Sequence, residues 1–156
     1  MLNKFELRLS QVRNLTKWER QAFVHMAWIL PTVWVLLRTL GFKKMLGMVE
    51  KEAKFSLRKP LPEGVAQEDY AQRCAQITEI AARHGLYQAN CLHQSLALCG
   101  FLRYLGLQAR LKIGVLPGSE PFQAHAWVEL DDTPLGRSVV EYHAFSKLDA
   151  WRASWI

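Results

Sequence analysis

Residues 90–106 read NCLHQSLALCGFLRYLG, and this stretch decides the fold. Apolar side chains recur in it at intervals of three and four, which predicts a helix that begins at Cys91 and is ended by Gly106. Leu98 and Phe101 widen the apolar stripe, so we expect the rest of the domain to enclose most of this helix. The stripe itself comprises Leu92, Ser95, Leu96, Cys99, Leu102 and Leu105.

Three strand-like segments follow the helix: Ala109–Val115, Gln123–Leu130 and Leu135–Tyr142. A Pro- and Gly-containing loop separates the first two. The run Asp131-Asp132-Thr133-Pro134 predicts a hairpin turn between the last two. Helices followed by an antiparallel sheet indicate the α+β class.

Upstream, the chain predicts a long helix from Lys17 towards Leu40. Thr16 and Glu19 have the spacing of a capping box, in which each side chain bonds the other residue's backbone N–H. Pro31 lies inside this segment and removes one helical hydrogen bond, so a kink or break is expected there. Gly41 is a plausible end of the helix.

Two more helices are expected before Cys91, over Lys43–Phe55 and over Gln67–His84. Residues 58–64 lie between them and read as a linker, because two prolines and a glycine fall within seven positions. We therefore predict a basic helical region over residues 1–60 and a second domain over residues 61–156.

The charge distribution agrees with this division. The chain has 156 residues and a formal charge of +6, and residues 1–60 hold twelve Lys/Arg against four Glu. A basic half of this kind can face an acidic peptide or an anionic membrane surface, or be a solvated face with no partner. Nucleic acid is not expected as a partner, because no nucleic-acid motif accompanies the charge.

The apolar run over residues 22–37 is the candidate membrane segment. Its 16 residues fall short of the roughly 20 that a span needs, so it predicts a buried or interfacial helix. Three cysteines without CxxC spacing indicate neither a disulfide framework nor a metal site. Reduced thiols suit a cytoplasmic protein, with membrane association as a further option.

Cys91 is the first candidate for chemistry. Asn90 is an N-cap type, so Cys91 opens the helix, where unpaired N–H groups and the helix dipole favour thiolate over thiol. The same N–H groups can hold an oxyanion. A lone cysteine in an apolar helix is more often an inert core residue, and Cys74 and Cys99 are read that way.

His125 is the second candidate. It lies in an alternating strand, where it shares a face with Trp127 and Glu129. An imidazole on a sheet that packs against the helix N-terminus could take the Cys91 proton and later protonate a leaving amine. A histidine on a strand is otherwise usually structural.

Three blocks carry a resemblance to a known family. They are CLHQSLAL from Cys91, GLQARLKIGV from Gly106 and AHAWVE from Ala124. Together they resemble the transglutaminase-like peptidase of lasso-peptide biosynthesis, the peptidase half of the B protein, typified by the microcin J25 maturation protein. The resemblance covers about residues 64–148.

The resemblance implies a papain/transglutaminase-like cysteine peptidase that removes the leader from a ribosomally made precursor peptide. It implies Cys91 as nucleophile and His125 as acid and base, with no cofactor and no metal. The implied partners are the precursor, a small leader-recognition protein, and an ATP-dependent, asparagine-synthetase-like cyclase.

The third catalytic member departs from the family pattern, because Arg137 stands about where an Asp is usual. Glu141 is the best substitute by position, and a Cys–His dyad or an orienting backbone carbonyl are the alternatives. Gln88 and Gln94 are candidate oxyanion donors, with Gln88 preferred. Trp127 is a candidate for substrate binding, although core packing is its ordinary role.

Two other functions stay open from the sequence. A transglutaminase-like enzyme can pass its acyl group to an amine instead of water. The fold could also serve as a non-catalytic peptide-binding or membrane-surface scaffold, with Arg137 marking a decayed triad.

Overall fold

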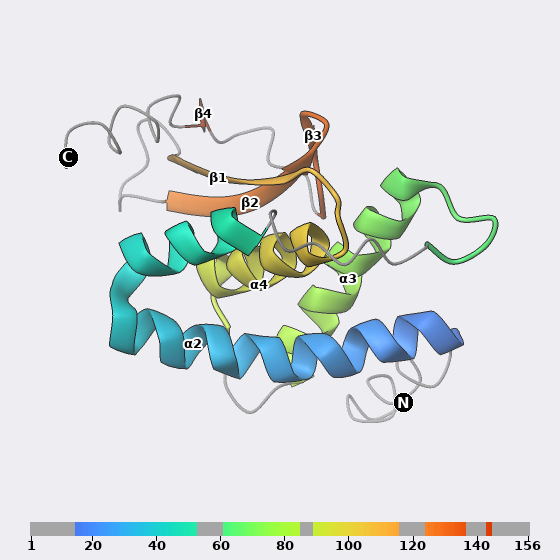
Figure 1. The fold of residues 1–156 in the computed structure, drawn as a ribbon, viewed down its shortest axis with the longest axis horizontal. Coiled ribbons are helices and arrows are strands. Elements are labelled where there is room, and N and C mark those ends of the chain that lie inside the picture. Colours follow the sequence, from blue (N-terminus) through green and yellow to red (C-terminus); the bar gives the residue numbers. More distant parts are fainter. Residues whose placement is uncertain (1–14, 53–60, 85–88, 116–123, 137–142, 145–156) are drawn as a thin grey trace, which may run out of the picture.

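In a computed structural model, the chain is described over residues 15–52, 61–84, 89–115, 124–136 and 143–144, with backbone only for 50–52, 115 and 143–144. The helices are α2 (Lys17–Glu52), α3 (Gln67–His84) and α4 (Cys91–Tyr104). The strands are β1 (Ala109–Val115), β2 (Ala124–Leu130), β3 (Thr133–Pro134) and β4 (His143–Ala144). Figure 1 shows α4 between the sheet on one side and the first half of α2 on the other. The mixed helices and antiparallel sheet agree with an α+β fold.

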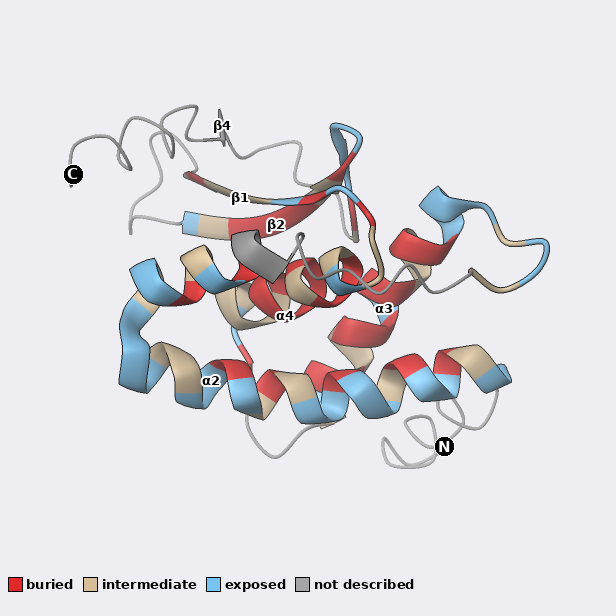
Figure 2. Ribbon diagram, viewed as in Figure 1, coloured by how far each residue is buried: buried red, intermediate tan, exposed pale blue. Residues whose placement is uncertain are grey.

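Helix α4 follows the sequence closely. Its N-cap is Asn90, whose Oδ1 accepts a hydrogen bond from the His93 N–H. At the other end Gly106 has φ 92°, and the N–H groups of Gly106 and Leu107 bond the carbonyls of Arg103 and Leu102. This is the Schellman arrangement, which requires the positive φ that glycine adopts without strain. Half of the α4 residues are buried, and Figure 2 shows them in the middle and second half of the helix.

Helix α2 begins with the capping box that the sequence predicts. The Glu19 N–H bonds Thr16 Oγ1 at 3.4 Å, and the Thr16 N–H bonds a Glu19 carboxylate oxygen at 2.6 Å. The sequence predicts a kink or a break at Pro31, and the break is wrong, since the residues on both sides of Pro31 stay helical. The helical conformation is interrupted at Gly41, as the sequence predicts, with φ 77° and ψ 166°, and the helix then folds back beside α4 (Figure 1).

One hydrophobic core joins the three helices to the sheet. Met26, Leu30 and Val33 of α2 belong to the same buried cluster as residues of α3, α4 and β2. The α3 helix contributes Ala71, Cys74 and Ala81 from a face with helical spacing. The predicted division at residue 60 falls in residues 53–60, outside the described part of the chain.

The sheet has the order β3-β2-β1-β4. Strands β1 and β2 are antiparallel along their whole length, with Gly114 opposite His125 and Leu111 opposite Val128. The hairpin turn is shorter than predicted. It uses only Asp131 and Asp132, both at positive φ, as a two-residue turn of the I′ type requires.

The predicted strand over 135–142 needs correction where the structure describes it. Strand β3 is Thr133–Pro134, inside the predicted turn, and Leu135 and Gly136 lie in no strand. The short turn is the reason, because pairing with β2 resumes directly after Asp132. Strand β4 pairs with β1, on the side of β1 away from β2.

Candidate active site

Cys91 is the first residue of α4, directly after the Asn90 cap. The Asn90 side chain engages the His93 N–H, and the Asn90 carbonyl accepts from the Gln94 N–H at 3.1 Å. The N–H groups of Cys91 and Leu92 lie in the first turn, where no earlier helical carbonyl can bond them. They are thus placed to stabilise negative charge at or near the Cys91 sulfur.

Cys91 also differs from the other two cysteines in its exposure. All three are free thiols, but Cys74 and Cys99 are buried, whereas Cys91 is partly exposed. Burial raises the pKa of the Cys74 thiol to about 12, which keeps that thiol protonated and unreactive. The prediction that Cys74 and Cys99 are buried core residues is confirmed.

His125 lies near the start of β2 and is half-buried. Its ring stacks on Trp127, with centroids 6.4 Å apart and planes 17° apart. The two side chains therefore share a face of β2, as the alternation predicts. Burial lowers the pKa of His125, so the neutral ring, the form that can accept a proton, is favoured at neutral pH.

Glu129 lies on the same face but serves other partners. One of its oxygens accepts from the Trp127 indole N–H at 3.0 Å, and the other pairs with Lys112 Nζ at 3.5 Å. Trp127 is only 5% exposed, and residues of β2 on both sides of it line the pocket described next. This arrangement fixes the indole beside His125.

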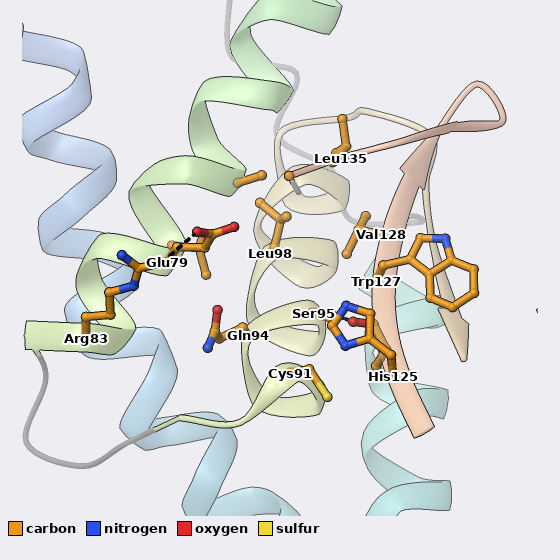
Figure 3. Close-up of a pocket in the computed structure, with 14 residues that line it drawn as sticks. Glu79, Arg83, Cys91, Gln94, Ser95, Leu98, His125, Trp127, Val128 and Leu135 are labelled. Atoms are coloured by element: carbon orange, nitrogen blue, oxygen red, sulfur yellow. Dashed lines mark hydrogen bonds and ion pairs between the residues drawn. The ribbon is translucent and has the colours of Figure 1, made fainter. Parts of the chain in front are cut away.

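Cys91 and His125 line one pocket of about 260 Å³. Figure 3 shows Cys91 on the first turn of α4 and the imidazole of His125 reaching over from β2, on the same side of the pocket. The opposite wall is α3, with Glu79 and Arg83 paired at 3.3 Å. This volume lies just below the range of about 300–1,000 Å³ that is usual for small-molecule sites.

A buried hydroxyl ties the cysteine helix to the histidine strand. Ser95, one turn after Cys91, donates from Oγ to the Ala126 carbonyl at 2.9 Å. The Leu135 N–H bonds the Val128 carbonyl at 2.8 Å, so that carbonyl points away from β1. Because carbonyl directions alternate along a strand, the Ala126 carbonyl points to the same edge of β2, where Ser95 meets it.

The end of the hairpin is tied to α3 on the other side of the pocket. The Gln72 side-chain amide donates to the Gly136 carbonyl at 3.2 Å and accepts from the Gly136 N–H at 3.1 Å. Gly136 has φ 88°, and a Cβ there would lie 3.6 Å from Glu79 Oε1. The pocket is therefore framed by three elements held together by specific polar contacts.

The other candidate site residues have different outcomes. Gln94 lines the pocket, but its side-chain amide donates to the Ala89 carbonyl at 2.7 Å, which turns one N–H towards the preceding loop. Gln88, Glu141 and Arg137 lie outside the described residues. Among the residues that the structure describes, no three His, Cys, Asp or Glu side chains gather as a metal site.

Three contributors to this site escaped the sequence analysis. Ser95 appeared only as a member of the apolar stripe, although a lone hydroxyl in a buried stripe is a signal that a polar partner lies nearby. Gln72 and the Glu79–Arg83 pair carry no local signal. Their roles depend on where α3 packs.

The geometry defines an α+β domain with a partly exposed thiol at a helix N-terminus and an imidazole on the adjoining sheet. A family model described as the transglutaminase-like superfamily matches residues 33–149, most of the chain. The chain therefore belongs to the transglutaminase-like superfamily, which includes cysteine peptidases and acyl transferases. No curated protein and no solved structure matches it significantly.

Proposed function

We propose that the protein is a cysteine peptidase that removes the leader from a ribosomally synthesised precursor peptide during lasso-peptide maturation. The observation that carries the proposal is the shared pocket of Cys91 and His125, with the thiol on the first turn of α4. Membership of the transglutaminase-like superfamily supports the general chemistry. The sequence blocks that resemble lasso-peptide B proteins support the particular substrate.

The acylation step uses groups that the site supplies. His125 takes the thiol proton as Cys91 Sγ attacks the scissile carbonyl, and the oxyanion faces the N–H groups of the first turn of α4. The carbon–nitrogen bond then breaks, and His125 gives its proton to the departing amine. The product of this half-reaction is a thioester on Cys91.

Deacylation repeats the proton transfers with water. His125 takes a proton from water as the oxygen attacks the thioester, and Cys91 leaves as the thiol when the proton returns to it. The products are a free carboxylate and the original enzyme. This sequence of steps involves protein groups and water alone, and Glu141 is the proposed orienter of His125.

The proposed partners follow from the same resemblance. They are the precursor peptide, a small protein that grips its leader, and an ATP-dependent, asparagine-synthetase-like cyclase that acts after cleavage. Gln88 and Trp127 are the proposed oxyanion and substrate contacts. Free thiols at all three cysteines support a cytoplasmic location.

The test is cleavage of a candidate precursor, in the presence of its recognition protein, by the wild type and by Cys91→Ala. Wild-type protein should release the leader, and Cys91→Ala should be inactive with an unchanged circular dichroism spectrum. Thr39→Ala, at an exposed position of α2, is the control and should cleave normally. Retained cleavage by a folded Cys91→Ala variant would remove Cys91 from its role.

Acyl transfer is the second candidate, because the superfamily includes acyl transferases. The two reactions share the Cys91 thioester and differ only in what attacks it. Mass spectrometry of the product separates them: a free carboxylate supports hydrolysis, and a new amide supports transfer. A protein that forms neither product, and whose Cys91 alkylates no faster than an ordinary thiol, would instead be a binding scaffold.

A further inference from the structure

The first half of α2 has two faces of opposite character. Residues at helical spacing on one face are buried against α3 and α4: Ala22, Met26, Leu30 and Val33. The opposite face follows intervals of four and three from residue 17 to residue 38. Its members are Lys17, Gln21, Val24, Trp28, Pro31, Val35 and Arg38, and all but Pro31 are exposed. We call this set the outer stripe.

The centre of the outer stripe is apolar and strongly exposed. Trp28 is 75% exposed, Val24 is 55% exposed and Val35 is 48% exposed. Trp34 borders the stripe and is 41% exposed. Contiguous exposed apolar side chains of this size mark a surface that contacts something other than water.

Basic residues stand at both ends of the stripe. Lys17 begins it, Arg38 ends it, and Arg20 lies beside its start; all three are exposed. The Arg38 guanidinium also lies 5.8 Å from the centre of the Trp34 ring. From residue 17 to residue 49 the helix carries five basic residues and one acid, Glu19.

That acid does not offset the positive surface. Glu19 is 6% exposed and forms an ion pair with Arg73 of α3. Glu50 and Glu52 lie in the last turn of α2, after the change of direction at Gly41. The outer stripe is therefore an apolar band with cationic ends and no exposed carboxylate among its own residues.

An anionic lipid surface is the partner whose chemistry matches this pattern. Interfacial helices combine a Trp-containing apolar face with Lys and Arg, and bind anionic lipids through both. By length and composition, residues 17–49 could also cross a membrane, and only 17% of their most apolar window is buried. Spanning would, however, pull Met26 and Leu30 from the shared core and break the Glu19–Arg73 pair.

We propose that the outer stripe of α2 docks the protein in the plane of an anionic membrane surface. Figure 1 shows the first half of α2 on the side of α4 that faces away from the sheet. Docking through the stripe therefore leaves β2 and the pocket of Cys91 and His125 on the side away from the lipid. The inference concerns a surface outside the catalytic pocket and stands whether or not the proposed peptidase activity does.

The test is flotation of the full chain with vesicles of phosphatidylglycerol and phosphatidylcholine in equal parts, and with vesicles of phosphatidylcholine alone. Binding should require the anionic lipid and weaken with added salt. Trp28→Gln should weaken it about tenfold or more, since a large apolar side chain no longer enters the interface. Arg38→Gln should weaken it about fivefold, the effect of one basic residue near an anionic surface.

Arg110→Gln is the matched control, because Arg110 is an exposed arginine of β1 that pairs with Asp132 at 3.4 Å. It should bind vesicles like the wild type. Absence of binding to the mixed vesicles, or equal binding by the wild type, Trp28→Gln and Arg38→Gln, would overturn the proposal. So would a wild-type dimer in sedimentation that Trp28→Gln dissociates, because the stripe would then be an interface between two copies.

Discussion

Replacing Ser95 by alanine isolates the contact that joins the cysteine helix to the histidine strand. Ser95 is 7% exposed, and the change removes its hydroxyl, which donates to the Ala126 carbonyl at 2.9 Å. Loss of a buried hydrogen bond that leaves its acceptor without that partner costs about 1–3 kcal/mol. Alanine returns about 0.5 kcal/mol through its higher helix propensity. The expected net loss in the free energy of unfolding is therefore about 0.5–2.5 kcal/mol.

For a domain of this size, that loss corresponds to a Tm lowered by about 1–10 °C. Thermal and urea unfolding, monitored by circular dichroism, measure it. The rate at which iodoacetamide alkylates Cys91 measures the effect on the site, and it should fall because the His125 strand is held less firmly over α4. Thr32→Ala is the matched control, since Thr32 Oγ1 bonds the Trp28 carbonyl at 2.8 Å on the exposed surface of one helix.

Thr32→Ala should change the free energy of unfolding by less than about 0.5 kcal/mol, because its hydroxyl joins no two elements. If Ser95→Ala matches the wild type in both stability and alkylation rate, the Ser95 hydroxyl does not hold the site together. Loss of stability with an unchanged alkylation rate would limit Ser95 to a structural role.

Three further changes test other parts of the molecule. Burial alone would raise the pKa of the Glu19 carboxyl, but hydrogen bonds from Arg73 and Thr16 lower it below its ordinary value. The ionised carboxylate therefore stabilises the fold above about pH 4.3, and this contribution is lost as pH falls through the lowered pKa. Glu19→Gln should lower the free energy of unfolding, measured with urea at neutral pH, by about 2 kcal/mol and should weaken its fall at acid pH. An unchanged dependence of stability on pH would contradict the ion pair with Arg73. Gly41→Ala should lower stability by about 1–3 kcal/mol in the same assay, because φ 77° with ψ 166° is a conformation that glycine alone adopts readily. No atom lies within 4 Å of the added Cβ, so the cost is purely conformational, and equal stability would mean that the backbone at residue 41 relaxes. Burial lowers the pKa of His125, so on acidification the unfolded chain protonates this imidazole before the folded chain does, and stability falls as pH drops below about 6.5. His125→Gln should reduce the dependence of stability on pH in this range. An identical dependence would argue against partial burial of the ring.

Local signals predicted the elements that position Cys91. The spacing of apolar residues gave α4, Asn90 gave its cap, and Gly106 gave its end, because each depends on neighbours within two turns. The Thr16–Glu19 capping box was predictable for the same reason.

Features that depend on distant parts of the chain were not predictable. Pro31 looks like a helix breaker by local rules, but Leu30 and Val33 on either side of it are buried in the shared core, and packing keeps that segment helical. Ser95 meets a carbonyl 31 residues away, which spacing within α4 cannot reveal. The pairing of β4 with β1, at the edge of the sheet opposite β3, likewise joins segments that are distant in the sequence.

The superfamily assignment agrees with the class of protein that the sequence indicated, and the catalytic roles of its residues stay predictions. Cys91 and His125 were chosen from position and resemblance, and the structure brings both to one pocket. The role of Glu141 stays a prediction, since that residue lies outside the described part of the chain. Glu129, which shares the face of β2 with His125, accepts a hydrogen bond from Trp127 and forms an ion pair with Lys112.

The most direct test of the central claim is the rate at which iodoacetamide alkylates Cys91 at neutral pH in the wild type and in His125→Ala, followed by peptide mapping. If the two residues act as a nucleophile and its base, Cys91 is labelled rapidly in the wild type and at least about tenfold more slowly in the folded variant. Cys74 and Cys99 stay unlabelled in both, because they are buried. Equal labelling of Cys91 in the two proteins would show that His125 does not activate it, and would rule out a nucleophile–base pair of these two residues.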